Sequence, residues 1–134
     1  MSARSKARKR ALDILFAADL RGESASAALD RAIESGEGPT NDYTAVLVRG
    51  VVAEQSSIDA LLAEHSQGWS LERMPAVDRN VLRLGVYELI YVDDVADAVA
   101  VSEAVALVQD LSTDDSPQFV NGVLGAIVRR EATG

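Results

Sequence analysis

Residues 77–92 read VDRNVLRLGVYELIYV, and they carry the clearest structural pattern in the chain. If this stretch is helical, apolar side chains such as Val81, Leu84 and Val86 point in almost every direction around its axis. A helix that is apolar on all sides is usually buried in the middle of a domain. We therefore predict that residues 77–92 form the central helix, around which the rest of the chain packs.

The segments on both sides of this stretch also show helical spacing of apolar residues. We predict further helices over residues 7–20, 25–35, from 41 or 42 to about 65, 103–111 and 117–129, with a connector at 67–75 and a short extended piece near Val99. Gly22 is the expected end of the first helix, and Asn41 or Thr40 is the expected cap of the third. Ser102 and Ser116 precede the last two predicted helices as caps, the second of them followed by a proline.

Strand signals are weak, so the predicted fold class is all-α. We expect a compact single domain over residues 1–134, made of two small helical bundles with about six or seven helices. The similar stretches VLVRGV (46–51) and VLRLGV (81–86) lie in two of these helices. They indicate either two similar three-helix halves or, as we favour, two helices that each need a small residue where they cross a neighbour.

Charge is distributed unevenly along the chain. The net charge is −8, but residues 1–10 contain five basic side chains and no acid, whereas residues 88–115 contain eight acids and no base. A protein with a basic N-terminal segment and an acidic remainder can bind a polyanion and a basic protein at separate sites. Residues 1–6 are expected to be a flexible basic arm, and a solvated terminus without function is the alternative interpretation.

Motifs for catalysis or metal binding are weak. The chain has no cysteine and a single histidine, His65, which excludes thiolate zinc sites and sites with several histidines. The acid pairs 93–94 and 114–115 are interpreted as helix boundaries rather than as metal ligands. There is no phosphate-binding loop, no membrane-spanning run and no clear signal peptide. We therefore expect a cytoplasmic binding protein without enzymatic activity, cofactor or metal.

Four sequence blocks, taken together, resemble a known family. They are ARKRALDILF (7–16), VDRNVLRLGVYEL (77–89), VSEAVALVQ (101–109) and STDDSPQFVNGVLG (112–125), with WSLER (69–73) as a linker before the central helix. Their order and spacing are similar to those of the NusB family of bacterial transcription antitermination factors. The resemblance implies two three-helix bundles and binding to boxA RNA of nascent transcripts. It also implies a protein partner, the small-subunit ribosomal protein called NusE in this role, and a complex that helps RNA polymerase resist termination in ribosomal RNA operons.

The resemblance also suggests which residues bind. For RNA these are the basic residues Arg4, Lys6, Arg8, Lys9 and Arg10, together with Asp115 and Phe119; for the protein partner they are Asp78, Phe16 and Tyr87. Guanidinium groups pair with phosphates, an aromatic ring stacks on unpaired bases, and a carboxylate accepts from a base amino group. As an alternative, the three aromatic residues Phe16, Tyr87 and Phe119 pack in the core. The alternative for Asp78 and Asp115 is a role at the end of a helix. Asn121 and Gly122 are assigned to helix packing.

The sequence departs from the family pattern at a few positions, and other functions stay open. Many members have Pro at position 96, Asn at 102 and Lys near 109 and 118, where this chain has Ala96, Ser102, Gln109 and Gln118. The missing lysines put the strength of RNA binding in doubt. One alternative is a protein-binding helical adaptor or homodimer with weak RNA affinity. Another is the helical module that precedes a ribosomal RNA methyltransferase.

Overall fold

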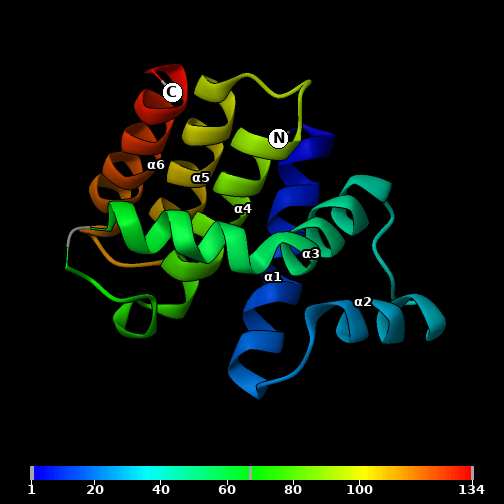
Figure 1. Cartoon of the computed structure of the whole chain (residues 1–134). Helices are drawn as coiled ribbons and strands as arrows, with labels where there is room; N and C mark the ends of the chain where they lie inside the picture. Colours follow the sequence, from blue (N-terminus) through cyan, green and yellow to red (C-terminus); the bar gives the residue numbers. More distant parts are fainter. Residues whose placement is uncertain (1, 67, 134) are drawn as a thin grey trace.

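The computed structural model describes residues 2–66 and 68–133, and this part of the chain is helical without any strand. The elements are α1 (Ala3–Arg21), α2 (Ala25–Glu34), α3 (Asp42–His65), the short 3₁₀ helix η1 (Leu71–Arg73), α4 (Ala76–Tyr91), α5 (Asp97–Leu111) and α6 (Ser116–Thr133) (Figure 1). The predicted all-α class is confirmed. Within the described residues, no helix is both long enough and apolar enough to cross a membrane.

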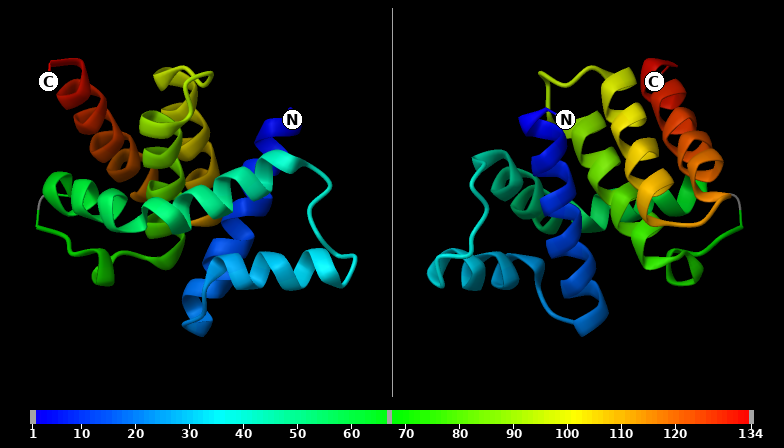
Figure 2. Two further views of the ribbon diagram at one scale, coloured as in Figure 1. Left: turned by 45° about the vertical axis from the view of Figure 1, so that its right-hand side comes forward. Right: turned by 180° about the vertical axis from the view of Figure 1, so that it is seen from behind.

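Helix α4 lies in the middle of the molecule, as its sequence predicted. It packs against α1 and α3 on one side and against α5 and α6 on the other. Seen from behind, α1, α4, α5 and α6 stand side by side (Figure 2). Val81, Leu82 and Val86 of α4 are completely buried. The two bundles, α1–α3 and α4–α6, are therefore joined through a shared helix.

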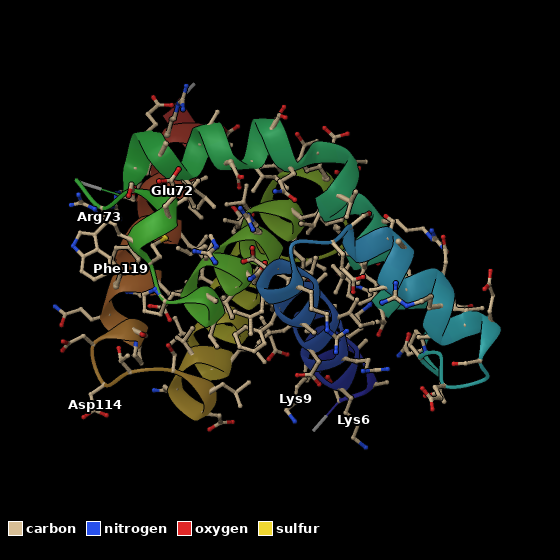
Figure 3. All side chains as sticks on the ribbon, turned by 90° about the horizontal axis from the view of Figure 1, so that it is seen from below. Lys6, Lys9, Glu72, Arg73, Asp114 and Phe119 are labelled. Atoms are coloured by element: carbon tan, nitrogen blue, oxygen red, sulfur yellow. The ribbon has the colours of Figure 1, made fainter. Side chains whose placement is uncertain are left out.

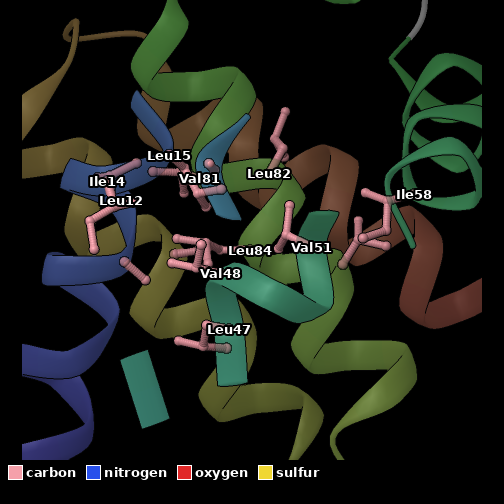
Figure 4. Close-up of a cluster of buried hydrophobic side chains, with 14 of the residues drawn as sticks. Leu12, Ile14, Leu15, Leu47, Val48, Val51, Ile58, Val81, Leu82 and Leu84 are labelled. Atoms are coloured by element: carbon pink, nitrogen blue, oxygen red, sulfur yellow. The ribbon is translucent and has the colours of Figure 1, made fainter. Parts of the chain in front are cut away.

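One continuous hydrophobic core connects both bundles. Its larger members are Leu12, Ile14 and Leu15 of α1, Leu47, Val48, Val51 and Ile58 of α3, and Val81, Leu82 and Leu84 of α4 (Figure 4). Helix α6 adds Val120, Leu124 and Ile127 to the same cluster. Because all these side chains belong to a single cluster, burial of apolar area stabilises the two bundles jointly.

Two glycines mark the close helix crossings. A β-carbon at Gly50 of α3 would lie 2.1 Å from Cζ of Tyr87, and one at Gly85 of α4 would lie 2.8 Å from Cδ1 of Leu124. The interpretation of the two similar stretches as crossing helices is therefore confirmed. Gly122 is different, because a β-carbon there would have no neighbour within 4 Å. The assignment of Gly122 to helix packing is wrong.

Most helix ends follow the sequence prediction. Gly22 ends α1 in the left-handed region (φ 69°), and its N–H donates to the carbonyls of Ala18 and Asp19. The side chain of Asn41 accepts from the Tyr43 N–H and caps α3. These are the positions and residue types that the pattern indicated.

Helix α5 begins earlier than predicted. It starts at Asp97, so Val99 is helical rather than extended, and Ser102 lies inside the helix instead of capping it. Ala100 and Ala104 are both buried and stand one turn apart, which extends the apolar stripe of the helix in front of Ser102. Tertiary packing of this stripe outweighs the cap signal.

The basic start of the chain also differs from the prediction. Residues 3–6 form the first turn of α1 rather than a separate arm. The Ser2 hydroxyl accepts from the Ser5 N–H at 3.0 Å and caps the helix. Basic residues 4–10 therefore stand at fixed positions around a helix axis, which separates them in space.

Candidate nucleic-acid and protein interfaces

Arg8 points into the protein. Only 4% of the residue is exposed. Its Nε donates to both carboxylate oxygens of Glu88 at 2.9 and 3.0 Å, and its Nη1 donates to Glu103 at 3.0 Å. Burial disfavours the charged form of Arg8 and by itself would lower its pKa. The hydrogen bond to Glu88 and the charges of Glu88 and Glu103 outweigh burial, so the pKa of Arg8 is raised. This corrects the expectation that Arg8 contacts RNA, because its donors already join α1 to α4 and α5.

Tyr43 completes this buried cluster from α3. Its hydroxyl donates to Glu88, and its pKa is raised by burial and by the neighbouring carboxylate. Arg4 lies over the Tyr43 ring, with its guanidinium carbon 4.2 Å from the ring centre, and pairs with the exposed Asp94 at 3.2 Å. The hydrogen bond to Asp94 is the main cause of a raised Arg4 pKa. A phosphate would have to displace Asp94 to reach Arg4.

Lys6, Lys9 and Arg10 are the accessible cations of the basic segment. The two lysines are exposed and Arg10 is half-buried, with Nη2 donating to the Glu37 carbonyl at 3.5 Å. Lys6 and Arg10, one turn apart, line a pocket of about 250 Å³ against residues 38–41. Both lysines project from one edge of the molecule (Figure 3). These three side chains are the part of the predicted RNA set that can meet phosphates without rearrangement.

Asp115 and Phe119 form a second, separate location. Asp115 is exposed in the turn before α6, and Phe119 follows one helical turn later. Figure 3 shows Phe119 at a different edge of the molecule from Lys6 and Lys9. The ring of Phe119 meets that of Trp69, with 5.5 Å between centroids and 42° between planes. Trp69, which the resemblance treated only as part of a linker, is 51% exposed and was missed as a candidate.

Asp78 is not a surface residue. It is 2% exposed, and its two carboxylate oxygens accept from the hydroxyls of Ser112 at 2.6 Å and Ser116 at 2.8 Å. The carboxylate therefore ties the start of α4 to the turn between α5 and α6. This corrects the expectation that Asp78 faces the protein partner, because both of its oxygens are already used inside the chain.

The two remaining partner candidates have different surroundings. Tyr87 is half-buried, rests on Gly50 and stacks on Tyr91 at 5.4 Å between centroids. Its ring therefore belongs to the α3–α4 crossing. Phe16 is half-buried on α1, one turn before Leu20, which is 64% exposed. Phe16 and Leu20 form an apolar pair on the surface of α1, and Leu20 is not among the partner residues predicted from the sequence.

A second polar cluster holds the connector between the bundles. Asp19 of α1 accepts from Arg79 at 2.7 Å and from Asn80 at 2.9 Å. Arg79 also donates to the carbonyls of Leu71 at 2.9 Å and Met74 at 3.3 Å. Burial opposes the charge of Asp19, but its donors outweigh burial and lower the aspartate pKa. Arg79 thereby fixes the connector that carries Trp69.

Comparison with known proteins gives consistent results. The model of the NusB family matches residues 5–129. The transcription antitermination protein NusB of Nocardioides sp. (strain ATCC BAA-499 / JS614) is 77% identical over 131 residues, which cover 98% of this chain and 97% of that protein. The crystal structure of antitermination factors NusB and NusE in complex with dsRNA contains a chain with 33% identity and a TM-score of 0.82, covering 95% and 96% of the two chains. A chain in the crystal structure of a plectonemic RNA supercoil has 34% identity and a TM-score of 0.86, covering 100% and 99%.

Proposed function

This chain belongs to the NusB family, and we propose that it is a non-catalytic transcription antitermination factor. In this proposal it binds boxA RNA of nascent transcripts together with NusE, in the cytoplasm. The pair joins the complex that lets RNA polymerase resist termination in ribosomal RNA operons. The solved structure that combines NusB, NusE and dsRNA supports both kinds of partner.

The RNA-binding part of the proposal rests on one observation. The N-terminal part of helix α1 carries three cationic side chains, Lys6, Lys9 and Arg10, whereas the whole chain has a net charge of −8. An acidic protein attracts RNA only through a local basic patch, since phosphate contacts supply most of the affinity. Arg4 adds a fourth cation when RNA replaces Asp94, which is exposed and easily displaced. Arg8 takes no direct part.

The protein partner is proposed to bind elsewhere on α1. Phe16 and Leu20 present apolar surface on α1. The chain is acidic overall, and this negative charge favours a basic protein as the partner. An apolar anchor surrounded by complementary charge is a common form of protein interface. Leu20→Asp should weaken NusE binding in calorimetry while the unfolding temperature stays close to that of the wild type. Undiminished affinity would place the partner on another surface.

The dependence of RNA affinity on salt tests the RNA site. With three phosphate contacts, or four when Arg4 takes part, the logarithm of the binding constant for single-stranded boxA RNA should fall against the logarithm of salt concentration with a slope of about −2 to −3, at about −0.7 per phosphate. The variant K6Q/K9Q/R10Q should lose most of this slope and most of the affinity at 0.15 M salt. Fluorescence anisotropy with labelled RNA, with and without NusE, measures both quantities.

A matched control uses a cation on another helix. Arg49 of α3 is exposed, as Lys6 and Lys9 are, and pairs with Asp30 at 2.7 Å. Arg49→Gln should therefore leave the affinity and the slope unchanged. Equal binding by K6Q/K9Q/R10Q and the wild type would refute the proposed RNA site. Sedimentation of the chain without RNA tests the homodimer alternative, in which a second copy covers the RNA surface.

A further inference from the structure

The ion pair between Arg4 and Asp94 joins the start of α1 to the turn between α4 and α5, which lie next to each other in the fold (Figure 2). Nη1 of Arg4 donates to Oδ1 of Asp94 at 3.3 Å, and Nη2 donates to Oδ2 at 3.2 Å. Two nitrogens of the guanidinium therefore face two oxygens of one carboxylate. Arginine binds a phosphate in the same bidentate geometry, so this carboxylate stands where a phosphate would stand on Arg4.

This ion pair is open to solvent, unlike the pair of Arg8. The side chains of Arg4 and Asp94 are 42% and 69% exposed, whereas those of Arg8 and Glu88 are 5% and 3% exposed. Water screens an exposed pair, which therefore contributes little to stability. An anion from solution can thus replace Asp94 on Arg4, whereas Arg8 stays enclosed with its carboxylates.

The backbone on both sides is held in place without this pair. The start of α1 is tied to α3, because the Asn41 side chain donates to the Ala3 carbonyl at 3.3 Å. The turn between α4 and α5 is anchored by Val95, which is 7% exposed and whose N–H donates within the turn at 3.3 Å. The Asp94 side chain can therefore leave Arg4 while both elements keep their positions.

The ring of Tyr43 supports the Arg4 guanidinium. The guanidinium carbon lies 4.2 Å from the ring centre, which is within the range of a cation–π contact. Tyr43 is itself fixed, because it is 8% exposed and its hydroxyl donates to Glu88. The guanidinium therefore keeps its orientation when its anion is exchanged. An incoming phosphate finds the donors already in position, which lowers the entropy lost on binding.

We infer that Asp94 occupies the phosphate position of Arg4 in the free protein and that RNA replaces it there. The inference rests on the proposed function, because it concerns how the same RNA gains this contact. RNA that is already held by Lys6, Lys9 and Arg10 brings its next phosphates to a high effective concentration, whereas a free anion has no such advantage over a carboxylate of the same chain. Asp94 therefore lowers the RNA affinity and makes Arg4 a contact that forms last.

Asp94→Asn tests this inference, and Asp93→Asn is its matched control. Asp93 is exposed in the same turn, so its substitution measures the effect of removing one negative charge. We expect Asp94→Asn to bind single-stranded boxA RNA about 1.5- to 5-fold more tightly than Asp93→Asn at 0.15 M salt, since RNA no longer competes with an exposed ion pair. The slope of affinity against salt should be about −3, because Arg4 then contacts a phosphate in every complex.

The same substitutions in an Arg4→Gln background show whether the gain depends on Arg4. There, Asp94→Asn should gain no more affinity than Asp93→Asn does. A series of boxA oligonucleotides, each with one uncharged methylphosphonate linkage, locates the phosphate concerned. One linkage should weaken the binding of Asp94→Asn more than that of the wild type, and the same linkage should have no effect on Arg4→Gln. Fluorescence anisotropy measures all of these affinities.

The outcomes separate this inference from the proposed function. If the wild type shows no salt-dependent RNA binding, both are wrong. If the wild type binds RNA but Asp94→Asn and Asp93→Asn bind equally well, the role of Asp94 is wrong and the proposed function stands. The same conclusion follows if Asp94→Asn gains as much affinity without Arg4 as with it. A large fall in the unfolding temperature of Asp94→Asn would show that the pair holds the fold together, which also overturns the inference.

Discussion

Arg8 and Lys9 are neighbours in sequence, yet they have opposite roles in the structure. Arg8 is enclosed by Glu88 and Glu103, whereas Lys9 is exposed. Removing one partner of a buried ion pair costs about 3–5 kcal/mol, because the remaining charge is left unpaired. Arg8→Ala should lower the free energy of unfolding by that amount. Lys9→Ala should change it by less than about 0.5 kcal/mol and should weaken RNA binding instead. Denaturant unfolding and anisotropy measure the two effects.

The opposite result would restore the original interpretation. If Arg8→Ala folds as stably as the wild type and loses RNA affinity, Arg8 is an RNA contact. A sequence signal for its burial does exist. Arg8 stands one turn before Leu12 and two turns before Leu15, on the apolar stripe of α1. Its carboxylate partners, however, lie 80 and 95 residues further along the chain, and no local pattern connects them.

Asp19 predicts how stability depends on pH. Its pKa is lowered by Arg79 and Asn80 against the opposing effect of burial. A lowered folded-state pKa means that stability is present above the unfolded value, about 3.9, and is lost as pH falls below it. Asp19→Asn should therefore be less stable than the wild type at pH 7, and the difference should shrink below about pH 4. Urea unfolding across this range measures the difference.

The control for this pH effect is an acid on the surface. Asp93→Asn changes an exposed position, so its stability should stay within about 0.5 kcal/mol of the wild type at pH 7. A constant difference between Asp19→Asn and the wild type from pH 7 to pH 3 would contradict the assignment, since it would show that the charge of Asp19 contributes nothing.

Among the elements, the crossing of α4 and α6 is the most sensitive to size. A β-carbon at Gly85 would overlap the end of Leu124, which is completely buried and cannot swing away. Overpacking of this kind costs about 1–3 kcal/mol, and the better helix propensity of alanine returns about 0.5–1 kcal/mol. Gly85→Ala should therefore be destabilising in thermal unfolding. In a Leu124→Ala background, the same change should be neutral or stabilising, and a cost that persists there would place the overlap elsewhere.

An element can be predicted from the sequence when the residues that define it are close together in the chain, and not when packing against distant elements defines it. The middle of α4 and the cap residues Gly22 and Asn41 are local signals, and they identified their elements correctly. The start of α5 was misplaced because Ser102 looks like a cap, while the packing that extends the helix to Asp97 comes from other elements. Asp78 was misassigned for a similar reason. An acid in the first helical turn is typical of a surface, and only the fold brings Ser112 and Ser116 to it.

For the whole molecule, the distribution of charge was predictable and the position of the binding groups was not. The sequence shows that positive charge is concentrated in residues 4–10. Helix α1 then distributes these residues around its axis, so that Arg8 points inward and Lys6 and Lys9 point outward. Trp69 lies 50 residues before Phe119, and only the folded chain shows that the two rings meet. The sequence therefore shows which kinds of residue a binding site contains, but the arrangement of these residues in space follows only from the folded chain.

The central position of α4 also determines which parts of the protein can unfold locally and which unfold only with the whole chain. Since α4 contacts four other helices, its backbone amides should exchange with solvent deuterium only when the whole chain unfolds. Helix α2 packs mainly against α1 and α3, buries only Ala25 and Leu29, and leaves a cleft of about 630 Å³ against α1. Its amides should exchange through local opening at a much lower free energy, and protection of α2 equal to that of α4 would contradict this view. Arg10 lines that cleft, so fluctuations of α2 would change the surroundings of one proposed RNA contact while the rest of the protein stays closed.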